Sequence, residues 1–209
     1  RLQPGTRAQW GLPDDALVET ADAAVRAAEA LGHPVALKLC GRAIAHKTER
    51  GLVRLGLRDA SEVRSAADAL LAARQAGDGD AKLLVCRMVG GRRELIAGLV
   101  RDPSFGPCVM LGLGGIFAEA VGDVAFAVAP LAPGDAEDLI DALRYGKLLG
   151  EFRGEPAVSR RKLAEILEAL GRLGAARPEI RSIDVNPLIV SGDTPIVIDA
   201  LVELEGEVL

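Results

Sequence analysis

Residues 101–119 constrain this chain more than any other stretch, because a strand-like run there opens into clustered glycines and ends on a carboxylate. The stretch reads RDPSFGPCVMLGLGGIFAE. Glycines at positions 112, 114 and 115 allow positive φ angles and let several backbone N–H groups approach an oxyanion, which a chain of larger residues does poorly. The pattern is typical of a phosphate-binding loop, although a plain glycine turn has the same composition. The rest of the chain has to decide between the two.

The composition indicates a globular protein and argues against two classes of partner. Of the 209 residues, 49% are hydrophobic and 26% charged, which is enough apolar material for a buried core. The net charge of -5 and the low aromatic content of 3% argue against binding to nucleic acid, which favours basic faces and stacking rings. The apolar runs are too short for a membrane span, and no secretion signal is visible. We expect neither a nucleic-acid partner nor a membrane partner.

The cysteines point to a reducing compartment. Cys40, Cys86 and Cys108 lie in apolar, strand-like runs without a C-x-x-C spacing, so a zinc site or a redox pair is disfavoured. They are interpreted as buried thiols, and a cytoplasmic location is predicted. The chain begins with Arg1 rather than Met, which suggests a longer reading frame.

Helix and strand patterns follow one another in a mixed order. Thr20 is a candidate N-cap for an Ala-rich helix over residues 21–31, which Gly32 and Pro34 would end. Further helices are predicted over residues 59–76, 133–144 and 159–173. Strands are predicted over residues 16–19, 34–40, 51–57, 82–89, 94–100, 108–111, 124–129, 180–190 and 196–203. The fourth and fifth strands would flank a Gly90-Gly91 turn, and the last two would form a hairpin.

This order predicts an α+β fold with two lobes. A small helix-and-strand lobe would cover residues 1–85, and a larger lobe of antiparallel strands with flanking helices would cover residues 86–209. A cleft between lobes is the natural ligand site. The side chains and loops expected to point into it are Lys38, the loop of His46, Glu94, the Gly114-Gly115 loop and the polar residues of the last hairpin.

Lys38 is unusual because it stands in the middle of the apolar strand PVALKLC. A lysine in a strand often lays its stem along the core and extends its amine to water. If it were aimed into a cleft instead, it would be a ligand for phosphate.

The last hairpin carries oxygen-bearing side chains among Ile, Val and Leu. Strand alternation places Asp184 and Asn186 on one face, and a hairpin could bring Asp199 close to Asn186. A carboxylate and an amide oxygen, completed by phosphate oxygens and water, suit Mg²⁺ beside a nucleotide. A polar face turned to solvent is the alternative.

Taken together, these residues resemble the ATP-grasp domain of the NDP-forming acyl-CoA synthetases. The resemblance is to the β subunit or β-like domain of ADP-forming acetate–CoA ligase, and more distantly to the β subunit of succinyl-CoA synthetase. It covers nearly the whole chain and implies an ATP-grasp fold with a nucleotide cleft between two lobes. Its seven ordered motifs are PVALK at 34–38, AHKTERG at 45–51, MVGG then ELIAG at 88–98, RDPSFGP at 101–107, LGLGGIFAE at 111–119, IDVNPLIV at 183–190 and VIDA at 197–200.

The resemblance implies a phosphoryl relay. In this family, acyl-CoA and phosphate give an acyl phosphate, and the phosphoryl group passes to a histidine of the CoA-binding partner, then to a histidine of the ATP-grasp part, and finally to ADP. His46 matches the second histidine. A neutral imidazole is a good nucleophile near neutral pH, which suits this role. Without the motif, a lone loop histidine would be read as a surface residue.

Further roles follow from the same resemblance. Lys38 matches the lysine that neutralises nucleotide phosphates, and Glu94 matches a nucleotide-contacting glutamate. Backbone groups near Met88 and Val89 should meet the adenine edge. Glu119 ends the phosphate loop, although a purely structural carboxylate is the alternative there.

The transfer site is assigned in the same way. Gly114 and Gly115 would donate N–H groups near the transferring phosphoryl group. Asn186 and Asp199 match the Mg²⁺ ligands, and Asp184 matches the acid that orients the phosphohistidine. The implied cofactors are therefore Mg²⁺ and ATP or ADP.

The chain departs from the family pattern at four positions. Leu52 stands where a second glycine usually follows Gly51, and Cys86 stands where a polar residue is common. Ala127 replaces an arginine, and Ser159 replaces an aspartate. None of these removes a residue of the relay, but together they leave room for weakened turnover.

Two functions are therefore weighed. The first is the ATP-grasp part of an acid–CoA ligase, which needs a CoA-binding domain or α subunit in the same or a separate chain. The alternative is a degenerate, ligand-sensing regulatory domain of a protein lysine acetyltransferase. The complete relay set favours the ligase.

Overall fold

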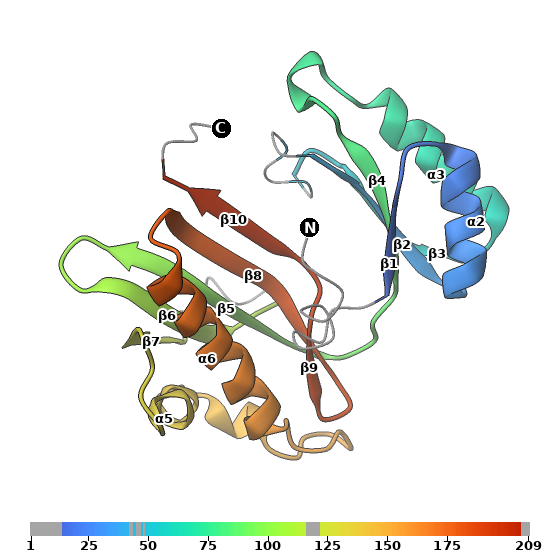
Figure 1. The fold of residues 1–209 in the computed structure, drawn as a ribbon. Coiled ribbons are helices and arrows are strands. Elements are labelled where there is room, and N and C mark those ends of the chain that lie inside the picture. Colours follow the sequence, from blue (N-terminus) through green and yellow to red (C-terminus); the bar gives the residue numbers. More distant parts are fainter. Residues whose placement is uncertain (1–13, 42–43, 45–46, 48, 116–121, 206–209) are drawn as a thin grey trace. The chain divides into compact units, whose positions relative to one another are not determined.

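The computed structural model describes residues 14–41, 44, 47, 49–115 and 122–205 (Figure 1). These residues form two compact units, one running to Met88 and the other beginning at Val89. The division into domains at residues 85 and 86 stays a prediction. In the described part of the chain, no helix has the length and apolar character that a bilayer span requires.

The smaller unit is a four-stranded sheet covered on one face by two helices (Figure 1). The strand order is β1-β4-β2-β3, and all three neighbouring pairs are antiparallel. The strands are β1 (Asp15–Val18), β2 (Val35–Cys40), β3 (Val53–Leu57) and β4 (Lys82–Arg87). The helices are α2 (Ala21–Leu31) and α3 (Ala60–Ala72), and a short 3-10 helix, η1 (Ala76–Asp78), follows α3.

The capping residues explain where these helices begin. The Thr20 side chain accepts a hydrogen bond from the Ala23 N–H at 3.2 Å, so it is the predicted N-cap of α2. Asp59 accepts from the Glu62 N–H at 2.9 Å and caps α3. The α3 helix ends at Ala72 rather than near Ala76, because the chain turns into η1 there.

The larger unit is a six-stranded antiparallel sheet with its helices on one face (Figure 1). Its order is β10-β8-β5-β6-β7, and β9 also pairs with β8. The strands are β5 (Arg93–Asp102), β6 (Gly106–Leu113), β7 (Val124–Val128), β8 (Ile180–Ser191), β9 (Thr194–Val197) and β10 (Ala200–Leu204). The helices are α5 (Asp135–Asp141), the 3-10 turn η2 (Gly146–Leu149) and α6 (Arg160–Ala176), which packs on β5 and β6.

The strands on either side of Gly90 and Gly91 do not pair with each other. The preceding strand β4 pairs with β1 and β2, whereas the following strand β5 pairs with β6 and β8 in the other sheet. A Cβ on Gly91 would lie 2.2 Å from the Val190 carbonyl oxygen, so this glycine permits close packing beside β8. Two glycines between strands can form a tight turn of a hairpin or a connection between two sheets, and the sequence alone does not distinguish these cases.

Candidate functional site

The structure brings together the three oxygen-bearing residues of the last hairpin. The predicted second strand is split into β9 and β10, and Asp199 stands in the gap between them. The Asn186 N–H donates to the Asp199 carbonyl oxygen at 3.2 Å. Asp184, two residues before Asn186, lies opposite Leu201. The predicted proximity of Asp199 to Asn186 is thereby confirmed.

Strand alternation sets the face on which these side chains lie. Asp184 and Asn186 are exposed, whereas Ile183, Val185 and Leu188 are buried in the core of the larger unit. The two polar side chains therefore lie on the face of the sheet opposite that core. Sequence reasoning found this pair because the alternation is regular.

The electrostatics of this hairpin suit a cation. Partial burial raises the pKa of Asp184, and the neighbouring charge of Asp199 raises this pKa further. A divalent cation between these groups would relieve that repulsion. Nowhere in the residues that the structure describes do three or more His, Cys, Asp or Glu side chains form a metal cluster. A Mg²⁺ held here by carboxylate and amide oxygens would need its further ligands from phosphate and water.

A second group forms where β5 meets the end of β6. The Gly114 N–H donates to the Glu94 carbonyl oxygen at 2.8 Å, and a Cβ on Gly114 would lie 3.0 Å from the Glu94 carbonyl carbon. Gly115 has a φ of +85°, and a Cβ there would lie 3.9 Å from Glu94 Oε2. Glu94 therefore lies beside both glycines of the predicted phosphate loop. The Gly114 N–H, predicted to face the phosphoryl group, is already engaged by Glu94, so Gly115 remains the predicted donor. Both positions require glycine, the first for close packing and the second for its backbone angle.

Lys38 is placed in the smaller unit, in the middle of β2, opposite Leu84 and Val53. Its side chain is only 5% exposed, which contradicts the alternative of an amine extended to bulk water. Burial of a lysine amine calls for a polar or anionic partner.

The segment predicted to meet adenine follows β4. The Met88 N–H donates to the Pro34 carbonyl oxygen at 3.3 Å, so this N–H is already engaged. The backbone carbonyl of Met88 and the backbone of Val89 remain the predicted adenine contacts.

Two predicted site residues, His46 and Glu119, lie outside the described residues. The described neighbours of His46 are informative. The Lys47 carbonyl accepts from the Leu52 N–H at 2.8 Å, and the Leu52 side chain is 1% exposed in the core of the smaller unit. The comparison with the family pattern, in which Leu52 replaces a glycine, did not reveal this core role.

The remaining departures also have structural positions. Cys86 is buried opposite Ala36 and Asp15. Ala127 is partly buried against the core of the larger unit. The Ser159 hydroxyl accepts from the Lys162 N–H at 3.5 Å as the N-cap of α6, so serine retains the capping function of an aspartate.

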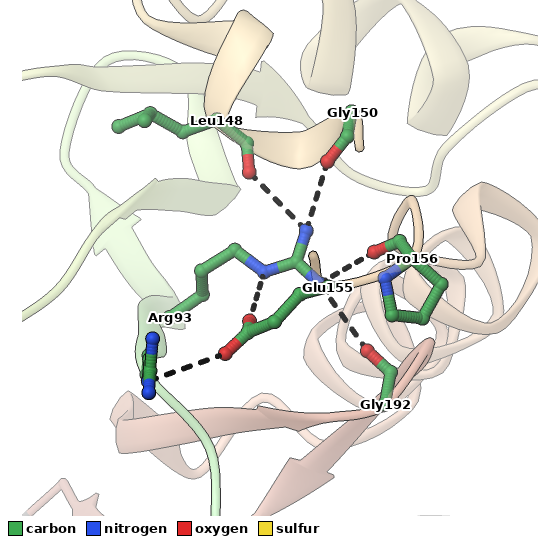
Figure 2. Close-up of polar contacts among 7 residues, drawn as sticks. Arg93, Leu148, Gly150, Glu155, Pro156 and Gly192 are labelled. Carbon is green, nitrogen blue, oxygen red and sulfur yellow. Dashed lines mark hydrogen bonds and ion pairs between the residues drawn. The ribbon is translucent and has the colours of Figure 1, made fainter. Parts of the chain in front are cut away.

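Sequence reasoning missed Arg93, whose side chain is almost completely buried (Figure 2). It donates to the Glu155 carboxylate at 3.1 Å and to four backbone carbonyls. These carbonyls belong to Leu148, Gly150, Pro156 and Gly192. Arg93 thus ties the start of β5 to the segment between α5 and α6 and to the β8–β9 turn. The sequence Arg92-Arg93-Glu94 does not indicate which of the two arginines is buried.

Comparison with known proteins agrees with this arrangement. A family described as an ATP-grasp domain matches residues 9–204. The β subunit of ADP-forming acetate–CoA ligase I from Pyrococcus furiosus is 36% identical over 192 residues, which are 90% of this chain and 83% of the relative. The ADP-forming 4-hydroxybutyrate–CoA ligase of Nitrosopumilus maritimus is 36% identical over 86% of this chain, but the match spans only 26% of that longer protein.

Solved structures show the same relationship. Acetyl-coenzyme A synthetase 1 of Ca. Korarchaeum cryptofilum, in complex with coenzyme A, Ca-AMPCP and HgCl+, superposes with a TM-score of 0.87 at 35% identity, covering 96% of this chain and 89% of that one. A second structure of that protein, with coenzyme A and Mg-AMPPCP, has its phosphohistidine segment pointing towards the nucleotide binding site. It superposes with a TM-score of 0.79 at 36% identity, covering 94% of this chain and 86% of that one.

Proposed function

Because this chain belongs to the ATP-grasp domain family, we propose that it is the nucleotide-handling, phosphoryl-relaying part of an ADP-forming acid–CoA ligase. The predicted α+β ATP-grasp fold is confirmed by the same comparisons. The observation that carries the proposal is the match to a separate ligase β subunit over 83% of its length. The reaction of the whole enzyme is acyl-CoA + ADP + phosphate ⇌ carboxylic acid + ATP + CoA.

The chemistry assigned to this chain is one reversible phosphoryl transfer. In the direction of ATP synthesis, the other ring nitrogen of phosphorylated His46 carries a proton. The N–P bond breaks as a terminal phosphate oxygen of ADP forms a new P–O bond, and the ring leaves as a neutral imidazole that keeps this proton. A histidine suits this step because its N–P bond is labile and its ring is a good nucleophile near neutral pH.

The described residues have positioning and electrostatic roles in this proposal. Lys38 neutralises nucleotide phosphates, and Glu94 contacts the nucleotide, with the backbone at Met88 and Val89 at the adenine edge. Gly115 would offer a backbone N–H group, whereas the Gly114 N–H is taken by the Glu94 carbonyl oxygen, so Gly114 contributes the close packing of the loop. Glu119 ends this loop in the sequence. The arrangement of Glu94 beside both glycines supports this reading.

The last hairpin would hold the cation and orient the histidine. Asn186 and Asp199 would hold Mg²⁺, which supplies positive charge opposite the phosphate oxygens when it is bound. Asp184 would orient the imidazole, and its raised pKa would fall once a cation is bound nearby.

The CoA and acyl groups are assigned to a separate CoA-binding domain or α subunit. The match to a long single-chain ligase over about a quarter of its length supports this division. The relatives described above are ligases and synthetases, and no observation favours the regulatory alternative. Cys40, Cys86 and Cys108 are thiols rather than halves of disulfides, which suits a reducing cytoplasm, where we place the protein.

A labelling experiment tests the proposal. The natural protein with its CoA-binding partner is incubated with Mg²⁺ and γ-labelled ATP, and acid-labile, base-stable label is mapped to peptides of this chain. We expect label on the peptide of His46 and none there in His46→Ala. The chain has two histidines, so His33→Ala is the matched control and should label normally. Absence of label from the wild type, despite ATP binding, would contradict the relay.

A further inference from the structure

Both described ends of the segment that carries His46 converge on one residue of the smaller unit. This segment connects β2 to β3 and runs from Gly41 to Gly51. The residue on which its ends converge is Asp78, the last residue of η1, which is only 4% exposed.

The second end is attached by an ion pair. Arg50 donates from Nη1 to Asp78 Oδ1 at 2.8 Å and from Nη2 to Asp78 Oδ2 at 3.0 Å. The Gln75 N–H also donates to Asp78 Oδ2 at 2.9 Å. The two-pronged contact fixes the orientation of the guanidinium as well as its distance, which a single hydrogen bond would not do.

The first end is attached by close packing against the same residue. A Cβ on Gly41 would lie 3.0 Å from the Asp78 carbonyl oxygen and 3.1 Å from the Ala81 Cβ. Asp78 therefore holds one end of the segment through its backbone and the other end through its carboxylate.

Arg50 also lies inside a closed turn that begins next to His46. The Leu52 N–H donates to the Lys47 carbonyl at 2.8 Å, and the Leu52 carbonyl accepts from the Leu39 N–H at 3.0 Å. The turn is thus closed by one backbone hydrogen bond and joined to β2 by another. The Arg50 side chain connects this turn to η1 through its two hydrogen bonds to Asp78.

We propose that Arg50 is a positioning residue for the phosphoryl transfer at His46, acting through its ion pair with Asp78. The proposal rests on the proposed function, because it gives Arg50 a purpose only if His46 carries the phosphoryl group. By fixing Arg50 within the turn closed by Lys47 and Leu52, the pair limits how far the chain next to His46 can shift during the transfer. A misplacement of about 1 Å can cost roughly 100-fold in rate.

The variant Arg50→Gln tests this in the complete ligase. We expect the single-turnover rate of His46 phosphorylation by Mg-ATP to fall about 10- to 100-fold, while the dissociation constant for ATP changes by less than about twofold. The conservative variant Arg50→Lys keeps the positive charge but loses the two-pronged contact of the guanidinium, so its rate should lie between those of Arg50→Gln and the wild type.

The matched control is Arg64→Gln. Arg64 forms an ion pair with Asp22 at 2.6 Å between α3 and α2 of the same unit, far along the sequence from the His46 segment. Its removal should leave labelling unchanged. Thermal unfolding of all three variants shows whether the fold is intact.

Two outcomes would overturn the positioning role. One is labelling of Arg50→Gln at the wild-type rate. The other is a parallel loss of ATP affinity, melting temperature and labelling rate in Arg50→Gln that is equally large in Arg50→Lys. That result would show that the ion pair stabilises the whole smaller unit rather than the transfer step. Failure of the proposed function is distinguishable, because the wild type itself would then bind ATP without taking label.

Discussion

Gly98 of β5 lies directly opposite Asp184 of β8, and the space above Gly98 is closed by backbone. A Cβ at this position would lie 2.7 Å from the Ile183 carbonyl oxygen. The backbone that carries Asp184 is therefore packed tightly against a glycine, and the place of this carboxylate depends on the absence of a side chain across the strand pair.

Replacing Gly98 with alanine should destabilise the larger unit. Because the added methyl group meets backbone rather than a flexible side chain, β8 has to shift, at a cost of about 1–3 kcal/mol. Urea unfolding measures this cost. The affinity for Mg-ATP should weaken at the same time, since Asn186, the proposed Mg²⁺ ligand, lies on the same strand β8. An unchanged unfolding midpoint would contradict the tight packing.

Gly90 and Gly91 should respond differently to the same substitution. A Cβ on Gly91 would lie 2.2 Å from the Val190 carbonyl oxygen, whereas a Cβ on Gly90 meets nothing within 4 Å. Gly91→Ala is therefore expected to lower the melting temperature by several degrees, and Gly90→Ala to leave it nearly unchanged. Differential scanning calorimetry of the two variants compares neighbouring positions with the same chemical change.

Arg93 and Arg92 form a second matched pair. The Arg93 side chain is 9% exposed with five hydrogen-bond acceptors around it, whereas Arg92 is 79% exposed and has a single distant contact to Glu155 at 3.9 Å. Arg93→Ala should lower the free energy of unfolding by about 3 kcal/mol or more, because it leaves buried carbonyls and a carboxylate without their hydrogen-bond donor. Arg92→Ala should cost less than about 0.5 kcal/mol. Equal losses would contradict this assignment.

The Arg50–Asp78 pair should make stability depend on pH in a defined direction. The Arg50 hydrogen bond, followed by the Gln75 N–H, lowers the pKa of Asp78 below its ordinary value of 3.8. A lowered pKa in the folded state gives stability that is present above 3.8 and is lost as the pH falls below that value. Asp78→Asn should therefore melt earlier than the wild type near neutral pH, and the gap should narrow under acid. A gap that stays constant would show that the carboxylate charge is not responsible.

Asp199 should matter to nucleotide binding only when magnesium is present. With Mg²⁺, Asp199→Asn is expected to weaken ATP binding by about tenfold or more, whereas in excess chelator the variant and the wild type should bind equally. Calorimetric titration measures both conditions. Asp193→Asn, in the β8–β9 turn where Asp193 contacts Lys162 and Thr194, is the control and should change neither. An equal loss in both conditions would argue against a metal ligand.

Local sequence patterns predicted those parts of the fold that depend on interactions between residues close together in the chain. The helix over Ala21–Leu31 begins and ends as expected, because Thr20 and Gly32 act on their immediate neighbours. The approach of Asp199 to Asn186 was also predictable, because a short turn fixes which residues face each other.

Features that depend on distant partners were not predictable in this way. Gly91 needs the backbone of β8, about one hundred positions later, to explain it. Leu52 stands out in the sequence only as a replacement for a glycine, because the sequence does not show that its side chain enters the core. Arg92 and Arg93 are the same residue type at neighbouring positions. Which of them is buried depends on the packing of the distant segment that carries Glu155.

The separation of the chain into two sheets has a consequence for its synthesis. All strands of the smaller sheet lie between Asp15 and Arg87, so this unit has its whole sheet once that stretch has left the ribosome. In the larger sheet, by contrast, β5 (Arg93–Asp102) pairs with β8 (Ile180–Ser191). One edge of β5 therefore stays unpaired until the last third of the chain has been synthesised. The nascent larger unit is exposed to wrong pairings during that interval, while the smaller one is already complete.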